Sequence, residues 1–354
     1  LVIIEPWEHV GINDAGEPVR ASKNVAFVAQ KIADCDSILW PLWSSGLPDL
    51  DRIMPILTGS LGVVCEGGQP SVYAPQQWTH PACSREAVLT VVERLLITRS
   101  SRSAPVLFIC LSHQLAAAAH IRLLQKTVET VLKSDALYFD TDGHALASLK
   151  TICHAIQEMG ASLSIHKRNG HRVAQGWQDA QFAVSRNEVS EVGERVLLPY
   201  QPPQRSSSGV PLELIHAHER MAAEDIWRMV MSSIMKDDNH FKISMFHNDE
   251  VNEEAILFAN WAYLKLHEGI IPYRYGIAGS QLSWLLRLPY GVQILASTVA
   301  NASTVTECSC TRIVYKDFET GKTHHSYTCQ FHPELLEDLR AIDPRPAPSY
   351  IDLK

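Results

Sequence analysis

The sequence predicts an α/β fold in which a mostly parallel central sheet is flanked by helices. Strand-like and helix-like segments alternate over about the first 125 residues, which is typical of parallel strands joined by crossover helices. The helix-like segments place their apolar residues at helical spacing. The chain has 354 residues, of which 46% are hydrophobic and 20% charged, the balance of a folded globular protein.

The first part of the chain supplies four strands and four helices in alternation. We expect strands over four apolar stretches rich in Val, Ile and Leu: 1–6, 37–43, 61–68 and 104–110. We expect helices over the amphipathic stretches that follow them: 23–35, 50–57, 84–100 and 113–133. The third strand runs into a glycine turn, and the fourth runs directly into its helix.

The remainder is less regular. Helices are expected over 144–160, 222–236 and 253–269, the last ended by Gly269. The Pro- and Ser-rich segment 201–211 is the best loop candidate. Further strands are expected over 162–168, 181–186, 195–200, 241–251, 292–299, 311–318 and 325–334, and the strand at 241–251 is expected to enter a polar turn.

Composition excludes several classes of protein. The formal net charge of −8 argues against a nucleic-acid surface, which needs clustered Lys and Arg. No apolar run approaches the roughly 18 residues that a membrane span needs, and the N-terminus lacks the features of a signal peptide. Eight cysteines in a chain of this length are too sparse for a disulfide scaffold, so we expect a reducing, cytoplasmic setting.

Cys110 is the first candidate for chemistry. It ends an apolar strand and stands immediately before a helix, which is the arrangement of a nucleophile elbow. The amides and dipole of a helix N-terminus favour a thiolate there. Ser112 is a small neighbour of the kind that an elbow requires, whereas Phe108 is not.

Two other segments supply the partners that such a cysteine needs. His332 follows a strand, Pro333 turns the chain, and Glu334 lies close enough to accept a hydrogen bond from the imidazole and fix its tautomer. Gly67 and Gly68 follow another strand, where glycine lets backbone amides approach a substrate carbonyl. Without these partners, each residue would have an ordinary structural explanation.

Together these segments resemble the class I (triad) glutamine amidotransferases. The family's G-x-C-x-G-x-Q motif reads FICLSHQ over 108–114, and its closing His-Pro-Glu motif stands at 332–334. Its S-G-G-P-x-S-V-Y segment, as in the GMP synthetase type, reads EGGQPSVY over 66–73, and its S-H-G-D-x-V loop reads FHNDEV over 246–251. The segments occur in the family order.

The resemblance implies a flavodoxin-like fold and a thiolate attack on the side-chain amide of glutamine. Cys110 would form the thioester and release ammonia, His332 would move the protons, and Glu334 would orient His332. Further positions match the family's oxyanion and substrate-binding positions: Gly67, Gly68, Leu111, Gln114, His247 and Asp249. No cofactor and no catalytic metal are implied. Neither a G-x-x-x-x-G-K-[ST] nor an S-G-G-x-D-S motif is present, so either a separate synthase subunit receives the ammonia or the protein hydrolyses a γ-glutamyl amide on its own.

The chain also departs from the family pattern. Phe108 and Ser112 replace both motif glycines around the cysteine. We expect one domain over 1–354, with insertions at about 126–240 and 252–290 that could dock a partner or form a substrate lid.

Three alternatives remain open. Phe108 motivates a catalytically weak or inactive family member that serves as a binding or regulatory subunit. A stand-alone hydrolase of γ-glutamyl amides or peptides is the second. The third is a zinc site built from Cys and His near the C-terminal strands, although its spacing fits no usual pattern: Cys308, Cys310, His324, His325 and Cys329.

Overall fold

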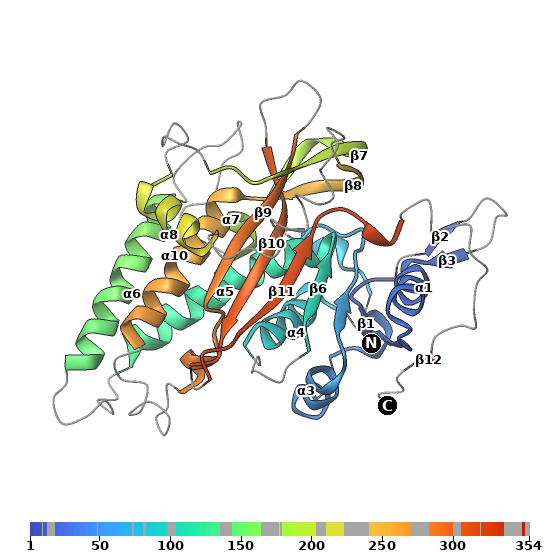
Figure 1. Cartoon of the computed structure of the whole chain (residues 1–354). Helices are drawn as coiled ribbons and strands as arrows, with labels where there is room; N and C mark the ends of the chain where they lie inside the picture. Colours follow the sequence, from blue (N-terminus) through green and yellow to red (C-terminus); the bar gives the residue numbers. More distant parts are fainter. Residues whose placement is uncertain are drawn as a thin grey trace.

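A computed structural model of the chain describes most of the sequence (Figure 1). The described ranges are 1–8, 10–12, 18–47, 49–72, 74–80, 83–97, 104–134, 144–163, 177, 179–202, 210–222, 241–270, 283–299, 306–318, 320–335 and 349–350.

A 10-stranded sheet forms the centre of the molecule, in the order β12-β4-β1-β5-β6-β11-β10-β9-β7-β8. Its strands are β1 (Val2–Glu5), β4 (Ile38–Pro41), β5 (Val63–Cys65), β6 (Val106–Ile109), β7 (Val184–Pro199), β8 (Phe241–Val251), β9 (Gly291–Val299), β10 (Thr306–Lys316), β11 (Thr323–Cys329) and β12 (Ser349–Tyr350). A separate hairpin joins β2 (Val10–Ile12) to β3 (Pro18–Arg20).

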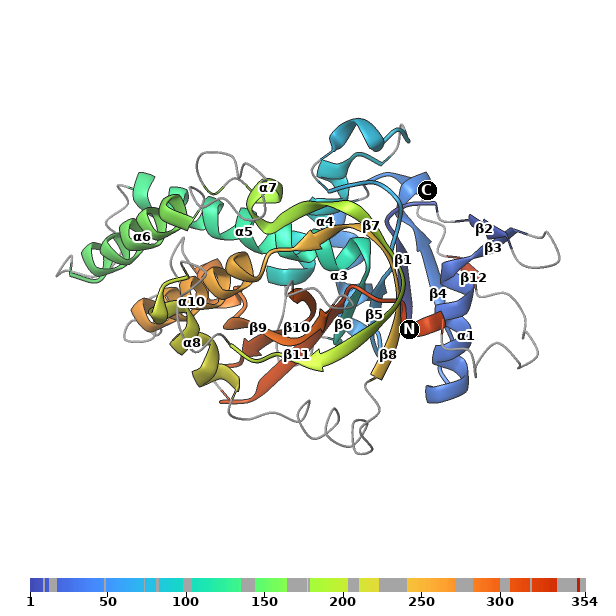
Figure 2. The same ribbon diagram turned by 90° about the horizontal axis from the view of Figure 1, so that it is seen from above.

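The direction of pairing changes at β11. All neighbours from β12 to β11 are parallel, and those from β11 to β8 are antiparallel. Seen from above, β7 and β8 form a long curved ribbon (Figure 2). The predicted class, an α/β protein with a mostly parallel central sheet flanked by helices, is confirmed.

Helices lie against both faces of the sheet. Their bounds are α1 (Ala21–Ala33), α2 (Leu42–Ser45), α3 (Leu50–Gly59), α4 (Arg85–Ile97), α5 (Leu111–Lys133), α6 (His144–Leu163), α7 (Asp179–Ala183), α8 (Leu212–Ala222) and α10 (Glu253–Ile270). Short 3₁₀ turns are η1 (Pro75–Gln77), η3 (Ser283–Arg287) and η4 (Pro333–Leu335). Figure 1 shows α6, α8 and α10 gathered at one end of the molecule and α1 at the other.

Two apolar clusters follow from strand alternation, because successive side chains point to opposite faces of a sheet. Ile4 and Phe108 belong to the larger cluster, which α4, α5 and α10 cover. Ile3 and Ile109 belong to the smaller cluster, which receives Val25 from α1. The side of the sheet to which a strand residue points therefore decides which of the two apolar clusters it joins.

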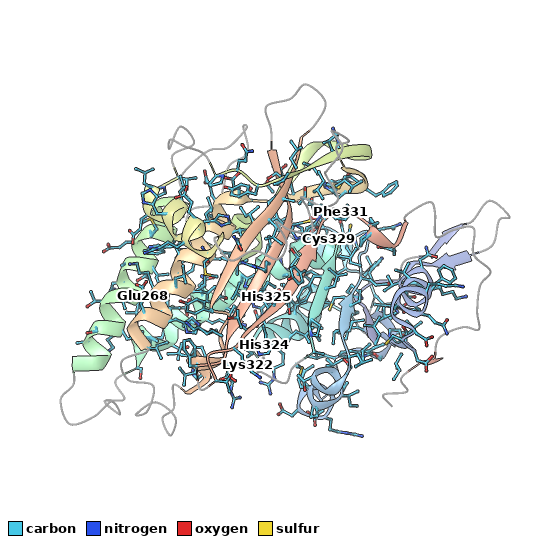
Figure 3. All side chains as sticks on the ribbon, viewed as in Figure 1. Glu268, Lys322, His324, His325, Cys329 and Phe331 are labelled. Atoms are coloured by element: carbon cyan, nitrogen blue, oxygen red, sulfur yellow. The ribbon has the colours of Figure 1, made fainter. Side chains whose placement is uncertain are left out.

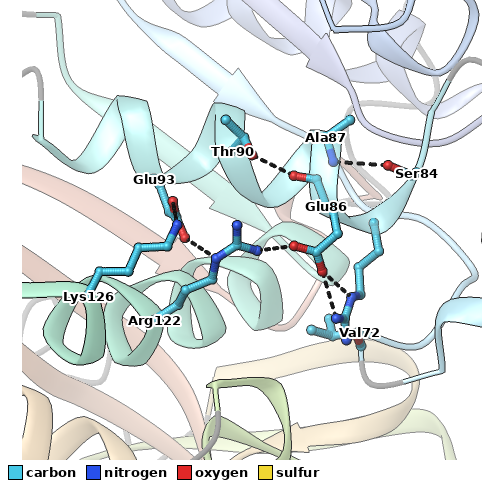
Figure 4. A network of polar contacts seen from close by, with 9 residues as sticks. Val72, Ser84, Glu86, Ala87, Thr90, Glu93, Arg122 and Lys126 are labelled. Carbon is cyan, nitrogen blue, oxygen red and sulfur yellow. Dashed lines mark hydrogen bonds and ion pairs between the residues drawn. The ribbon is translucent and has the colours of Figure 1, made fainter. Parts of the chain in front are cut away.

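An ion-pair network anchors α5, the helix that Cys110 precedes (Figure 4). Arg122 of α5 pairs with Glu86 and Glu93 of α4, the latter at 2.6 Å, and Lys126 reaches Glu93 at 2.7 Å. The side chains of Arg122 and Glu93 are mostly buried, so solvent screens this pair less than it would a surface pair. The network fixes α5 against α4 on the larger-cluster face of the sheet.

Several expected elements differ from those observed. α6 continues to Leu163 where a strand was expected over 162–168, and the rest of that segment lies outside the described residues. α7 ends at Ala183, so the expected strand at 181–186 starts later and extends as β7 to Pro199. The segment 126–240, for which helices were mainly expected, thus contains a long strand. The expected helix at 222–236 lies outside the described residues apart from its first position.

Among the described helices, none combines the length and the apolar character needed to cross a membrane.

Candidate active site

Cys110 occupies a sharp turn between β6 and α5, where it is the N-cap residue of the helix. Its backbone has φ 51° and ψ −110°, and among the described non-glycine residues only Asp34 shares a positive φ. Such a conformation costs on the order of 1–3 kcal/mol and persists where the surroundings enforce it. Here the Cys110 amide donates to the Cys329 carbonyl at 2.8 Å, and the Gln114 amide donates to the Cys110 carbonyl at 3.2 Å. The turn has the geometry that the sequence predicted.

His332 and Glu334 lie beside this turn because β11 and β6 are parallel neighbours. Cys329 and Ile109 are partners in register, so the residues that follow both strands emerge at the same edge. His332 lies within hydrogen-bond reach of the Cys110 side chain. Its Nδ1 lies 2.7 Å from Oε1 of Glu334, which leaves Nε2 for the sulfur. The three predicted catalytic residues are therefore adjacent.

The electrostatics around His332 favour its protonated form. Burial lowers the pKa of His332, but the Cys110 thiolate and hydrogen bonds to Cys110 and Glu334 outweigh that effect and raise this pKa well above its usual value. The arrangement can hold a nucleophile and a proton donor at the same time.

The two predicted oxyanion glycines pack against the elbow. A Cβ at Gly67 would lie 3.1 Å from Cys110 Cβ and 3.2 Å from His332 Cε1. A Cβ at Gly68 would lie 2.7 Å from a methyl group of Leu111, the first residue of α5. Amides in the first turn of a helix have no intrahelical partner, so the Leu111 N–H is available to an oxyanion on the Gly68 side of the elbow.

Gln114 links the elbow to β8. Its amide nitrogen donates to the backbone carbonyl of Asp249 at 3.0 Å and to Oε1 of Gln330 at 3.1 Å. Gln330 in turn donates to the Cys110 sulfur at 3.7 Å. The Gln114 side chain is thereby part of a buried chain of amides that reaches the sulfur.

His247 and Asp249 are buried on β8, which continues to Val251, so the expected polar turn is wrong. Register with β7, interrupted by a bulge between Arg186 and Glu191, keeps this segment in the sheet. Burial, with a smaller contribution from the charge of nearby His332, lowers the pKa of His247 to about 4. A neutral His247 therefore lies near the elbow at pH 7. The backbone carbonyl of Asp249 is linked to the elbow through the Gln114 side chain.

Phe108 does not fill the space beside Cys110. It is 1% exposed and belongs to the larger apolar cluster with Val106 and Leu115, whereas Cys110 belongs to the smaller cluster. Ser112, in the place of the other motif glycine, donates to the Glu66 carbonyl. Both substitutions are accommodated without blocking the sulfur.

The sequence reasoning missed three residues of this site. Gln330 contacts the sulfur, Phe246 has its ring centroid 6.0 Å from that of His332, and the Glu66 carboxyl is coupled electrostatically to His332. Gln330 and Glu66 could have been found, since each stands within two residues of a recognised motif position. Phe246 also directly precedes a motif position, His247, but the sequence does not show that its ring is 50% exposed and lies beside His332.

The alternative zinc ligands are spread along the strands. Cys310 and Cys329 are partners at one end of the β10–β11 ladder, whereas His324 and His325 pair with Tyr315 and Val314 toward the other end (Figure 3). Four residues of strand separate Cys329 from His325, about 13 Å. Within the described ranges no group of three or more His, Cys, Asp or Glu residues is placed to hold a metal ion, and all eight cysteines are free.

Comparisons with known proteins add little. A scan against models of protein families finds no match, and no curated protein matches. Among solved structures, the chain is similar to the Trypanosoma brucei CTPS glutaminase domain with bound acivicin, at 14% identity and a TM-score of 0.40, over 97% of this chain and 88% of that one. A TM-score of 0.40 is too low to transfer a function, so any assignment depends on the geometry of this site.

Proposed function

We propose that the chain is a cysteine hydrolase that removes the side-chain amide of glutamine and releases ammonia. The observation that carries this proposal is the strained turn at Cys110, with His332 and Glu334 on one side and two glycines against it. A non-glycine residue held at positive φ at a strand–helix junction, next to a base, is the kind of strain that accompanies function.

The proposed chemistry has two steps. The Cys110 thiolate attacks the amide carbon, and the amides of Gly68 and Leu111 hold the oxyanion. The His332 imidazolium gives its proton to the leaving nitrogen, so that ammonia departs and a γ-glutamyl thioester remains. Neutral His332 then takes a proton from water, which attacks the thioester, releases glutamate and restores the thiolate–imidazolium pair. Glu334 keeps Nε2 of His332 directed at the sulfur throughout. No cofactor takes part.

Gln114, His247 and Asp249 are assigned to substrate positioning. Gln114 and Gln330 form the amide chain to the sulfur, and the segment 246–251 lies beside it. We also propose that residues 1–354 form one domain, since strands from both ends of the sequence share the sheet. The insertions at about 126–240 and 252–290 are the proposed contact regions for a synthase subunit that would receive the ammonia.

The test uses a glutamine-mimicking electrophile and an ammonia assay. We expect the electrophile to modify Cys110, and we expect Cys110→Ala to abolish both labelling and ammonia release from glutamine. Cys83→Ala is the matched control, because burial raises the pKa of Cys83 to about 12 and makes it a poor nucleophile. Absence of labelling and of ammonia from the folded wild type, alone or with added synthase partners, would instead support a binding or regulatory subunit.

A specific observation favours a second candidate, a stand-alone hydrolase of substituted γ-glutamyl amides. The half-exposed ring of Phe246 lies against His332, where the leaving group would depart. The small amide group of glutamine makes no use of such an apolar surface, whereas an N-aryl or N-alkyl group would. Hydrolysis of γ-glutamyl anilide faster than of glutamine would select this candidate.

A further inference from the structure

Three buried carboxyl groups lie at the same edge of the sheet as Cys110. Glu5 ends β1, Glu66 follows β5, and Glu334 follows β11 in the same segment as His332. Because β1, β5, β6 and β11 are adjacent parallel strands, their carboxyl ends meet at one edge. Ile4 and Cys65 are partners in register, so Glu5 and Glu66 are neighbours on the next rung.

Alternation places Glu5 and Glu66 on the face of the smaller apolar cluster. Ile3 and Val64 belong to that cluster, as does Cys110, and side chains two residues apart in a strand share a face. All three carboxyl groups are buried, with exposures of 4%, 3% and 7% for Glu5, Glu66 and Glu334. Three negative charges this deep in a protein would need strong compensation.

Compensation is present for two of the three. Glu5 accepts hydrogen bonds from the Ser22 hydroxyl and from Trp43 Nε1, the latter at 3.2 Å. Glu334 receives His332 on Oε1. Oε1 of Glu66, in contrast, is buried with no hydrogen-bond partner among the described residues, and so is Oε2 of Glu334.

Glu66 therefore lies in an environment that favours its protonated form. Burial raises the pKa of Glu66 well above its usual value, the charges of Glu5 and Glu334 raise it further, and His332 lowers it only in part. These groups come from β1 and from the segment after β11, while α1 contributes the uncharged Ser22, Val25 and Ala26 to this face. A carboxylic acid in its protonated form is a hydrogen-bond donor.

We propose that Glu66 is a positioning residue whose proton is shared with the unpartnered oxygen of Glu334, directly or through one water. That bond would keep the other oxygen of Glu334 on His332 and so fix the tautomer that presents Nε2 to Cys110. This role for His332 rests on the proposed function, but the shared proton does not. When Glu66 ionises as the pH rises, the shared proton is lost, and repulsion between the two carboxylates disturbs the orientation of Glu334.

Two substitutions of Glu66 distinguish the effect of its hydrogen-bond donor from the effect of its side-chain volume. Glu66→Gln keeps the volume and a donor but cannot ionise, whereas Glu66→Leu keeps the approximate volume and has no donor. The first readout is the rate at which iodoacetamide alkylates Cys110 at neutral pH, followed by mass spectrometry of the peptide that contains it. The second readout is the pH profile of ammonia release from glutamine.

We expect Glu66→Gln to be alkylated within about threefold of the wild-type rate, and Glu66→Leu to be about 10–100-fold slower, as for other residues that orient a reacting group. The alkaline limb of the pH profile, where the wild type loses activity, should be flatter in Glu66→Gln. The control is Glu93→Gln, which removes a buried carboxylate from the α4–α5 network and should lower stability without changing the alkylation rate.

Three results would overturn the proposal. Cys110 could be alkylated at the wild-type rate in Glu66→Leu, or the alkylation rate could fall equally in both variants. The alkaline limb of the pH profile of ammonia release could also be unchanged in Glu66→Gln. Thermal unfolding of every variant shows whether it is folded, and Glu66→Gln alone decides the question if Glu66→Leu is not. Alkylation requires no turnover of glutamine, so absence of ammonia from the wild type would reject the proposed function and leave the alkylation contrast to decide the role of Glu66.

Discussion

Replacing Gly67 by alanine should disable the site while leaving the fold intact. The new Cβ would lie 3.1 Å from Cys110 Cβ, 3.2 Å from His332 Cε1 and 3.6 Å from the Cys110 sulfur. Carbon atoms pack optimally at about 3.5–4.0 Å, so Cys110 and His332 would each have to retreat by roughly 0.5 Å. Both proposed reacting groups would therefore move away from the added methyl group.

The magnitude follows from the sensitivity of catalysis to position. A misplacement of about 1 Å can reduce a rate by about 10²-fold. Two displacements of half that size predict a loss of about 10–100-fold in kcat for ammonia release, with KM changed by less than about threefold. Gly67 is not among the described glycines with positive φ, so the alanine adds no backbone strain and stability should fall by only about 1–2 kcal/mol.

Gly59→Ala is the matched control. A Cβ at Gly59, the last residue of α3, would meet nothing within 4 Å. We expect this variant to gain about 0.4–1 kcal/mol of stability with unchanged activity. Urea unfolding and steady-state ammonia release measure both effects. Wild-type kcat in Gly67→Ala, with the fold intact, would refute the placement of Cys110 and His332 at the reacting centre.

Four further predictions address other parts of the site. In Glu334→Gln we expect kcat to fall by about 10–100-fold. Because the pKa of His332 is raised by folding, the imidazolium stabilises the fold below about pH 6.5, and this contribution is lost as the pH rises through the raised pKa. Urea midpoints should therefore fall less toward alkaline pH in Glu334→Gln than in the wild type, and parallel curves would contradict this. Gln330→Leu removes the amide that contacts the sulfur, so the rate of Cys110 alkylation at neutral pH should fall by about 3–10-fold. Phe246→Ala should raise KM for γ-glutamyl anilide by about 3–10-fold and change KM for glutamine little, whereas equal effects would argue against an apolar leaving-group surface. With limiting electrophile at pH 7, Cys153 should remain unmodified, because burial raises its pKa to about 12, and modification at a rate similar to that of Cys110 would contradict the selectivity.

Local sequence was sufficient where one segment decides its own structure. Apart from the β2–β3 hairpin and the short helix α2, which were not expected, the alternating strands and helices up to Lys133 carry apolar periodicities that their final environment reinforces, so their type and order were predictable. The adjacency of Cys110 and His332 was expected only from the family resemblance, and in the structure it arises because β6 and β11 are parallel neighbours whose carboxyl ends meet.

Elsewhere, pairing between strands that are distant in the sequence decided the secondary structure. The polar segment at 246–251 has the composition of a turn, but pairing with β7 holds it in a strand. Composition alone could not reveal this, because the partner residues lie about 60 positions earlier and include a bulge. Composition also could not reveal the role of Phe246. That role depends on its contact with the His332 ring, which follows the distant strand β11.

Phe108 shows why comparison with a motif by position is incomplete. Read along the chain, a phenylalanine two residues before the cysteine replaces a glycine and suggests a blocked pocket. In a strand, however, residues 108 and 109 face opposite sides, and the turn at Cys110 then carries its side chain to the face that bears Ile109. Phe108 therefore packs beneath α5 among Val106 and Leu115, and its volume stabilises the helix that presents the sulfur. Because the bulk lies on that face, Phe108→Leu should lower stability by about 1–3 kcal/mol and leave the alkylation rate of Cys110 within about threefold. A large change in that rate at wild-type stability would instead place the Phe108 ring in the pocket.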